Sequence, residues 1–235
     1  MLFRSLTNIL DLPEDEKIRA FVSLRDFEQD AYLIMTTRSG IIKKTKLEEY
    51  SRPRANGIIA INLKGNDELI AVRTSSGSDE ILISTKQGQA IRFNEDKVRS
   101  VGRNSMGVKG ISLKGDDFGV SSEVIKDSKT QILTITENGF GKRTEVEKYR
   151  LTSRGGKGVT TLKITEKTGK IVNAFQVDNE TDVILLSSVG KANRLKASEI
   201  SIIGRATQGV RLMKLNDDIK VVAAAKLTEE KQNSE

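Results

Sequence analysis

Lysine and arginine side chains recur at two fixed positions along this chain, in a pattern that suits phosphate. The first position, four residues after a repeated glycine, holds Lys44, Arg92, Arg143 and Arg194. The second lies in a loop before another repeated glycine and supplies Arg52, Arg54, Arg103, Arg154, Lys157 and Arg205. Because these groups form charge-assisted bonds to phosphate oxygens, we predict that both rows, assisted by Lys43 and Lys142, bind a nucleic-acid backbone.

Two other interpretations of these cations stay open at the level of sequence. Carboxylates such as Glu48 and Glu147 lie near the first row, so those cations could instead form salt bridges between repeats. The net charge of +7, from 39 Lys and Arg against 32 Asp and Glu, is by itself a weak indication of a nucleic-acid partner. The regular spacing is what favours binding along a curved basic edge.

Catalytic chemistry finds no support in the residue types. The chain has no histidine and no cysteine, which excludes the usual triads, dyads and zinc sites. Its recurrent carboxylates occupy matching turn positions, where we expect solvated side chains; they are Glu48, Glu49, Asp96, Glu147 and Glu199. Residues 154–158 lack the spacing of a nucleotide-binding loop, and no helix follows them. We therefore predict no enzyme site, no metal and no cofactor.

The elements that position the cations repeat about every fifty residues. One set of glycines, Gly40, Gly88, Gly139 and Gly190, has gaps of 48, 51 and 51 residues. A second set, Gly57, Gly107, Gly158 and Gly209, has gaps of 50, 51 and 51. Such a period indicates equivalent units that bury their apolar faces against one another.

Each unit contains the pattern of four strands. Short apolar runs precede the first glycine, at 32–35, 81–83, 132–135 and 183–186, and a second strand follows the turn. An alternating third strand, as at 59–63, and a fourth, as at 69–72, complete the unit. A recurrent apolar position, filled by Tyr50, Val98, Tyr149 and Ile200, is predicted to lie in the core. Four strands in fifty residues are typical of a propeller blade.

The fold prediction is one all-β domain over residues 1–227. It has four complete repeats, at about 18–68, 69–117, 118–170 and 171–218, with partial blade strands at 6–12 and 219–227. Residues 228–235 are short, polar and predicted to be disordered. We expect a cytoplasmic protein, since no apolar stretch is long enough to cross a membrane and no signal peptide is present.

Several stretches resemble the C-terminal domain of the gyrase A protein, one of the two chains of bacterial DNA gyrase. The similarity covers nearly the whole chain and is most specific at Asn138 to Thr144 and at Glu199 to Val210; it also includes 67–70, 107–111 and 153–159. The related C-terminal domain of topoisomerase IV is the nearest rival. Residues 154–158 match five of the seven residues of the gyrase box Gln-Arg-Arg-Gly-Gly-Lys-Gly, but they lie in the next-to-last repeat rather than the first.

The resemblance implies a β-pinwheel, a propeller-like ring of blades that exchange strands, which begins upstream of Met1. It also implies that duplex DNA wraps around the outer rim and that this wrapping supports negative supercoiling by an ATP-hydrolysing type IIA topoisomerase. The implied partners are double-stranded DNA, the breakage-reunion region of gyrase A, and gyrase B, in the nucleoid. The catalytic tyrosine and the metal and ATP sites of that enzyme have no counterpart in this chain.

The functional hypothesis is sequence-tolerant binding of duplex DNA. An aromatic content of 4% argues against single-strand binding by base stacking. The alternatives are a protein-interaction propeller of the WD or kelch type, whose tryptophan-aspartate and paired-glycine patterns are missing, and a chromatin-regulator propeller, whose glycines are placed differently.

Overall fold

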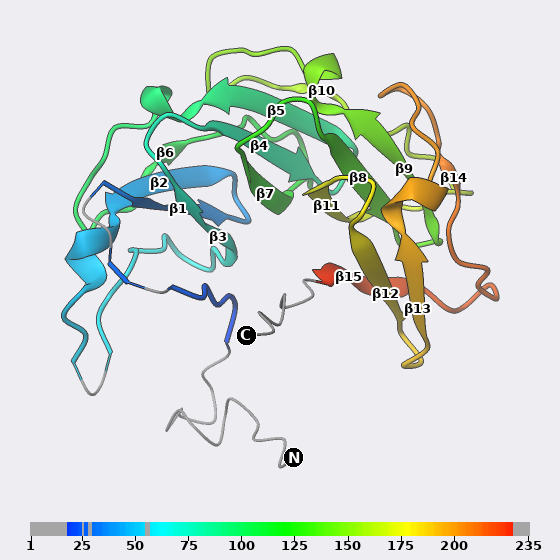
Figure 1. Ribbon diagram of the computed structural model, residues 1–235, viewed down its shortest axis with the longest axis horizontal. Helices are drawn as coiled ribbons and strands as arrows, with labels where there is room; N and C mark the ends of the chain where they lie inside the picture. Colours follow the sequence, from blue (N-terminus) through cyan, green and yellow to red (C-terminus); the bar gives the residue numbers. More distant parts are fainter. Residues whose placement is uncertain (1–17, 25, 28–29, 55–56, 228–235) are drawn as a thin grey trace, which may run out of the picture.

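The computed structural model describes residues 18–24, 26–27, 30–54 and 57–227. Within them the chain folds into four antiparallel sheets, or blades, that follow one another around an arch (Figure 1). The strand predicted at 6–12 and the tail predicted at 228–235 lie outside the described residues. No helix in the described part is both long and apolar enough to cross a membrane.

Every blade is built on a hairpin and a third long strand. The first blade contains β1 (Tyr32–Thr37), β2 (Ile41–Lys46) and β3 (Leu69–Ser75), and the second contains β4 (Glu80–Thr85), β5 (Gln89–Asn94) and β7 (Gly119–Ile125). The third contains β8 (Gln131–Thr136), β9 (Phe140–Glu145) and β11 (Ile171–Val177), and the fourth contains β12 (Asp182–Ser187), β13 (Ala192–Lys196) and β15 (Val221–Leu227). The strand predicted at 219–227 is thus β15, which pairs with β12.

Neighbouring blades exchange a short strand, as a β-pinwheel requires. The donated strands are β6 (Val108–Lys109), β10 (Val159–Thr160) and β14 (Val210–Arg211), and they pair with β2, β5 and β9 of the preceding blade. The first three sheets therefore have four strands, whereas the fourth has three among the described residues, with β13 at its edge. Figure 1 shows β3, β7, β11 and β15 along the concave side of the arch and the donated strands toward its convex edge.

Glycine is required where a donated segment crosses the preceding blade. Gly158 has a φ of +75°, and a Cβ there would lie 2.4 Å from the carbonyl oxygen of Ala90. Only a residue without a side chain allows this approach in that conformation. The glycine spacing seen in the sequence is thus the spacing of the blade crossings.

The apolar core lies between consecutive blades rather than at one centre. Ile34 and Ile42 of the first blade pack with Ile81, Ile83 and Phe93 of the second. A similar cluster joins the third and fourth blades; it includes Leu133, Ile135, Val183, Leu185 and Met213. Each hairpin buries its face against the next, which is why the repeats stack.

The core position predicted after each turn is confirmed in three blades. Val98, Tyr149 and Ile200 are buried, and Tyr50 is half-buried. Tyr50 ends, and the other three directly follow, a short 3-10 turn; these turns are η2 (Leu47–Tyr50), η3 (Glu95–Lys97), η4 (Val146–Lys148) and η5 (Ala197–Glu199). The strand predicted at 59–63 does not form, since this first donor segment has no preceding sheet to pair with among the described residues.

Candidate nucleic-acid interface

The first predicted row of cations does not form a surface. Lys44, Arg92 and Arg143 have exposed fractions of 6%, 8% and 4%. The backbone of the next repeat crosses at these residues, where Lys44, Arg92 and Arg143 form isolated bridges to Ser100, Leu151 and Ile202. The prediction that these three side chains face DNA is therefore corrected.

The buried arginines of the first row join one blade to the turn of the next. Arg92 Nη1 donates to the carbonyl oxygens of Val146 at 3.0 Å and Tyr149 at 3.1 Å, both at η4 of the third blade. Its Nε and Nη2 each lie 2.6 Å from Glu80 Oε2 within its own hairpin. Arg143 donates in the same way to the carbonyl oxygen of Ile200 at 2.8 Å, and burial lowers its pKa.

Lys44 makes the equivalent link with a carboxylate. Its Nζ lies 3.4 Å from Oε2 of Glu95, which is fully buried at the start of η3 in the second blade. The salt bridge between repeats that the sequence left open is thus present here. Arg194, in the fourth blade, is instead exposed and bonds Asp182 of its own hairpin.

Lys43 and Lys142, expected to assist in binding DNA, are buried with no exposed surface. Each ammonium group bonds a backbone carbonyl of the loops described next. Burial lowers the pKa of each to about 8. Neither side chain can reach a phosphate, so this part of the prediction is corrected as well.

The second row lies in one loop of each repeat. We call residues 51–54 with 57, 101–107, 152–158 and 203–209 the tip loops, and together the belt. In the last three, an arginine donates to a carbonyl of the preceding donor segment: Arg103 to Ile59 at 3.2 Å, Arg154 to Lys109 at 3.0 Å and Arg205 to Thr160 at 3.0 Å. Backbone bonds between successive repeats, such as Gly155 N to Gly110 O at 2.6 Å, reinforce the belt.

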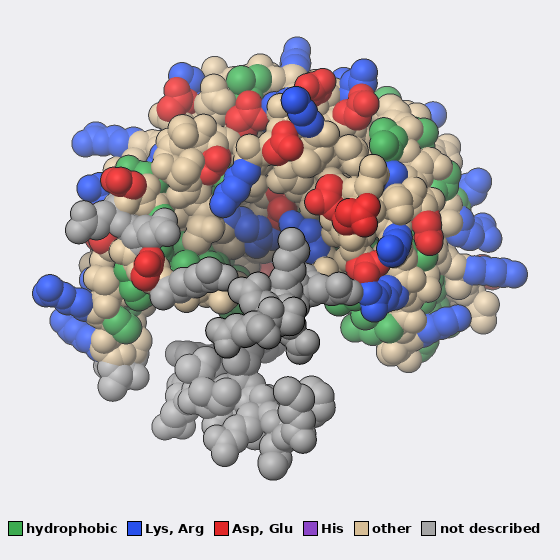
Figure 2. Space-filling view, in the orientation of Figure 1, with side chains coloured by type: hydrophobic (Ala, Val, Ile, Leu, Met, Phe, Trp, Pro, Cys, Tyr) green, Lys and Arg blue, Asp and Glu red, His purple; other side chains and the backbone are tan. Residues whose placement is uncertain are grey.

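The tip loops nevertheless keep positive charge in contact with solvent. Arg52, Arg54 and Lys157 are exposed, and Arg103, Arg154 and Arg205 are half-buried. Figure 2 shows Lys and Arg side chains projecting from the outer contour of the arch on its left, upper and right margins, while the face turned to the viewer mixes Asp and Glu with further Lys and Arg. The convex edge therefore carries projecting cations in this view.

Further exposed cations were missed in the sequence. Arg99 and Arg150 are exposed at equivalent positions, eleven residues after Gly88 and Gly139, just before the tip loops. Two donated strands add the exposed residues Lys109 and Arg211. The equal spacing from the glycines could have identified Arg99 and Arg150, but only two of the four repeats carry the cation.

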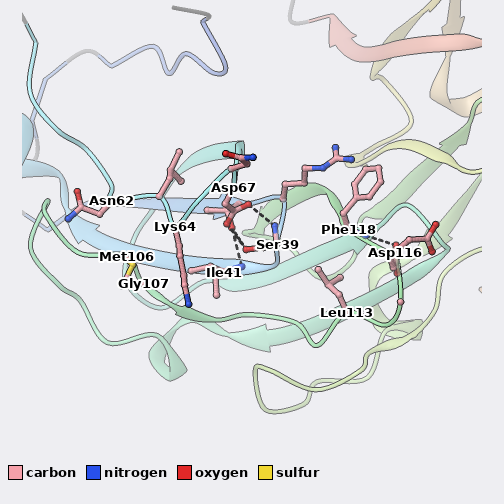
Figure 3. A pocket seen from close by; sticks show the side chains of 16 residues that line it. Ser39, Ile41, Asn62, Lys64, Asp67, Met106, Gly107, Leu113, Asp116 and Phe118 are labelled. Carbon is pink, nitrogen blue, oxygen red and sulfur yellow. Dashed lines mark hydrogen bonds between the residues drawn. The ribbon is translucent and has the colours of Figure 1, made fainter.

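A groove of about 800 Å³ lies between the first two blades (Figure 3), and the contacts along it are structural. Its wall holds Asp67, which accepts bonds from the backbone nitrogen of Ser39 at 2.9 Å and from the Ser39 hydroxyl. Hydrogen bonds to Ser39 lower the pKa of the Asp67 carboxyl despite its partial desolvation. Arg38 stacks on Phe118 at 3.3 Å along the same groove. These contacts fasten the hairpin turn of β1 and β2 to the loops around it.

No catalytic arrangement emerges in the described part of the chain. No three His, Cys, Asp or Glu side chains there are grouped to hold a metal ion. The turn carboxylates Glu48, Glu49, Asp96, Glu147 and Glu199 are exposed, as predicted.

Comparisons with known proteins agree with the architecture. The family described as "DNA gyrase C-terminal domain, beta-propeller" matches residues 31–76, 79–126, 130–178 and 181–228, which correspond to the four blades. The gyrase A protein of Salmonella typhimurium is 44% identical over 96% of this chain, and that of Staphylococcus epidermidis is 45% identical over 97%. The chain spans 26% of the length of each of these relatives.

Two solved structures share the fold. A DNA topoisomerase IV C-terminal domain has a TM-score of 0.88 at 26% identity, over 95% of this chain and 70% of that one. A DNA gyrase A C-terminal domain has a TM-score of 0.86 at 29% identity, over 96% of this chain and 75% of that one. The match of the family to every blade, with exchanged strands between them, establishes that this chain belongs to the DNA gyrase C-terminal domain family.

Proposed function

We propose that the convex edge binds duplex DNA without sequence preference and bends it around the arch. The observation that carries this proposal is the belt of tip loops, which places exposed cations on successive blades along one edge. Lysine and arginine contacts to phosphate position DNA but do not read its sequence. Bending 20–30 base pairs by 40–90° costs on the order of 1–6 kcal/mol, and contacts from several blades can offset that cost.

The binding residues in this proposal are the exposed and half-buried cations of the belt and of the positions just before it. They are Arg52, Arg54, Arg99, Arg103, Arg150, Arg154, Lys157 and Arg205. Arg194, which is exposed beside Asp182, stays a weaker candidate at the end of the arch. If about six phosphates are neutralised, log K falls with log salt at a slope of roughly −5.

Within a larger enzyme, this domain would act as a non-catalytic accessory. We infer that it supports negative supercoiling by gyrase, a type IIA topoisomerase that hydrolyses ATP, together with the breakage-reunion region of gyrase A and with gyrase B. Membership of the family and the names of the sequence relatives support this inference. A nucleoid-associated, cytoplasmic location would follow from that role.

Fluorescence anisotropy with a 40-base-pair duplex across a salt series tests DNA binding. The variant R54Q/K157Q should bind more than about tenfold more weakly at 0.1 M salt, with a slope smaller by roughly 2. The matched control K126Q/K129Q removes two exposed lysines of the β7–β8 connection and should leave both quantities near wild type. Absence of salt-dependent binding by the wild type would exclude the proposal and favour a protein-interaction propeller.

Ligation of a nicked plasmid in the presence of the protein tests wrapping separately. A wrapped duplex leaves a shift in linking number after the protein is removed, whereas simple binding leaves none. Binding without such a shift would restrict the proposal to DNA attachment.

A further inference from the structure

Lys43 and Lys142 occupy the same place in two alternate blades. Each is the third residue after the glycine of its hairpin, on β2 and β9, and each is completely buried. The corresponding residues of the other two blades are Ile91 and Asn193. A buried ammonium group is costly unless its donors are satisfied, so the partners of these two lysines indicate what they do.

Lys142 lies directly under the tip loop of the fourth blade. Its Nζ donates to the carbonyl oxygen of Gly204 at 2.5 Å, to that of Arg205, and to Thr207 Oγ1 at 3.0 Å. Thr207 Oγ1 in turn donates to Gly204 O at 2.8 Å. All three ammonium hydrogens thus have acceptors within one loop of the belt.

Lys43 of the first blade makes a similar contact with the tip loop of the second. Its Nζ donates to the carbonyl oxygen of Ala60 at 2.7 Å and to that of Arg103. It therefore fastens the tip loop of the second blade to the donor segment of the first. In both cases the lysine bonds the main-chain oxygen of the arginine that belongs to the proposed DNA-binding row.

The second blade shows that a blade forms without this charge. Ile91 fills the equivalent position there and packs against Gly156 in the tip loop of the third blade. A Cβ added to Gly156 would lie 3.5 Å from the Cδ1 of Ile91. Apolar packing is thus sufficient for that crossing. The lysines of the first and third blades instead form hydrogen bonds to the tip loop that crosses them. Such bonds fix the orientation of the loop, which apolar packing does not.

We propose that Lys43 and Lys142 are positioning residues, which hold the tip loops of the second and fourth blades so that Arg103 and Arg205 present their guanidinium groups to DNA phosphates. This inference rests on the proposed function of the convex edge. The lysine fixes the carbonyl of each arginine, and the side chain of the same arginine is fixed by its bond to Ile59 or Thr160. Each arginine is thereby held at its main-chain carbonyl and at its guanidinium, while the side chain stays only half-buried.

A double-mutant cycle on DNA affinity tests the positioning role. R205A should weaken binding roughly eightfold at 0.1 M salt, the contribution of one phosphate contact. K142M should weaken it by a similar factor, and K142M/R205A should be no weaker than R205A alone, because Lys142 acts only through that loop. The control pair K142M and K157Q should combine as the product of the two single effects, since Lys157 lies in a different tip loop.

The outcomes distinguish the two proposals. Wild-type protein that fails to bind DNA overturns both the proposed function and this inference. Wild-type binding with K142M unchanged, or a K142M/R205A loss equal to the product of the single losses, overturns the inference alone. K142R, which keeps the charge and the donors, should recover part of the affinity lost in K142M.

Hydrogen exchange on the wild-type protein covers the case in which K142M fails to fold. Amides of residues 204–208 should exchange at least about tenfold more slowly than those of 153, 154, 156 and 157, whose loop is packed on Ile91 and has no lysine beneath it; Gly155 is left out because its amide bonds Gly110 O. Equal exchange rates in the two loops would show that Lys142 does not hold its loop, and would overturn the inference.

Discussion

Arg73 Nη2 donates to Glu123 Oε1 at 2.6 Å, and this pair joins the inner strand of the first blade to that of the second. Glu123 is 3% exposed and also lies 3.6 Å from the Nζ of Lys226, on β15 of the fourth blade. One buried carboxylate on the concave side therefore links three blades through cations of the first and the fourth. The tip loops make the corresponding links on the convex edge.

Replacing the carboxylate with an amide should loosen this inner contact. We expect E123Q to lower the free energy of unfolding by about 1–3 kcal/mol, since a buried bond between charged groups becomes a weaker one. Urea unfolding measures the change. The matched control E48Q removes an exposed partner of Lys46, and its effect should stay below about 1 kcal/mol. Equal effects of the two variants would contradict the role of Glu123.

The first-row arginines should affect stability rather than DNA binding. R92K keeps the charge but cannot reach Glu80 and the two carbonyls of η4 together, so we expect a loss of about 2–3 kcal/mol in the free energy of unfolding. The DNA affinity and salt slope of the folded protein should be unchanged. Urea unfolding and anisotropy report the two quantities. A reduced salt slope in R92K would show that Arg92 contacts DNA after all.

Stability should depend on pH through Lys142. Burial lowers its pKa from 10.5 to about 8 in the folded protein, so between these values the unfolded chain binds the proton more tightly. The free energy of unfolding therefore rises with pH from about 8 to 10.5 because of this group. Urea midpoints at pH 7.5 and 9.5 should show this rise in the wild type and a smaller one in K142M. The same pH dependence in both proteins would contradict the prediction.

Equivalent glycines of two repeats, one at a blade crossing and one not, offer a matched comparison. Gly158 and Gly57 have φ values of +75° and +77°, but a Cβ would meet Ala90 O at 2.4 Å only in the first; the second has nothing within 4 Å. We expect G57A to cost about 1 kcal/mol from backbone strain and G158A at least about 3 kcal/mol, because the clash adds to the strain. Thermal or urea unfolding would measure both. Similar costs would show that the crossing can widen without penalty.

The sequence predicted the repeat, the hairpins and most of the core, because these depend on patterns within one unit. It could not separate buried from exposed cations, since the partners of Arg92 and Arg143 are main-chain carbonyls of the next blade, which no residue type reveals. Donor segments presented a related difficulty. Residues 59–63 and 108–111 have similar apolar patterns, yet only the second finds a preceding strand to pair with among the described residues. Pairing between repeats is a property of the assembled arch.

The outer strand of the fourth blade, β13, leaves main-chain donors and acceptors along its edge in the described part of the chain. Such an edge is a template on which another chain can add a strand and aggregate. Its residues alternate between more and less exposed, and Arg194 and Lys196 are among the exposed ones. The cationic Lys196 on this border makes strand addition by a second copy less favourable than an uncharged edge would.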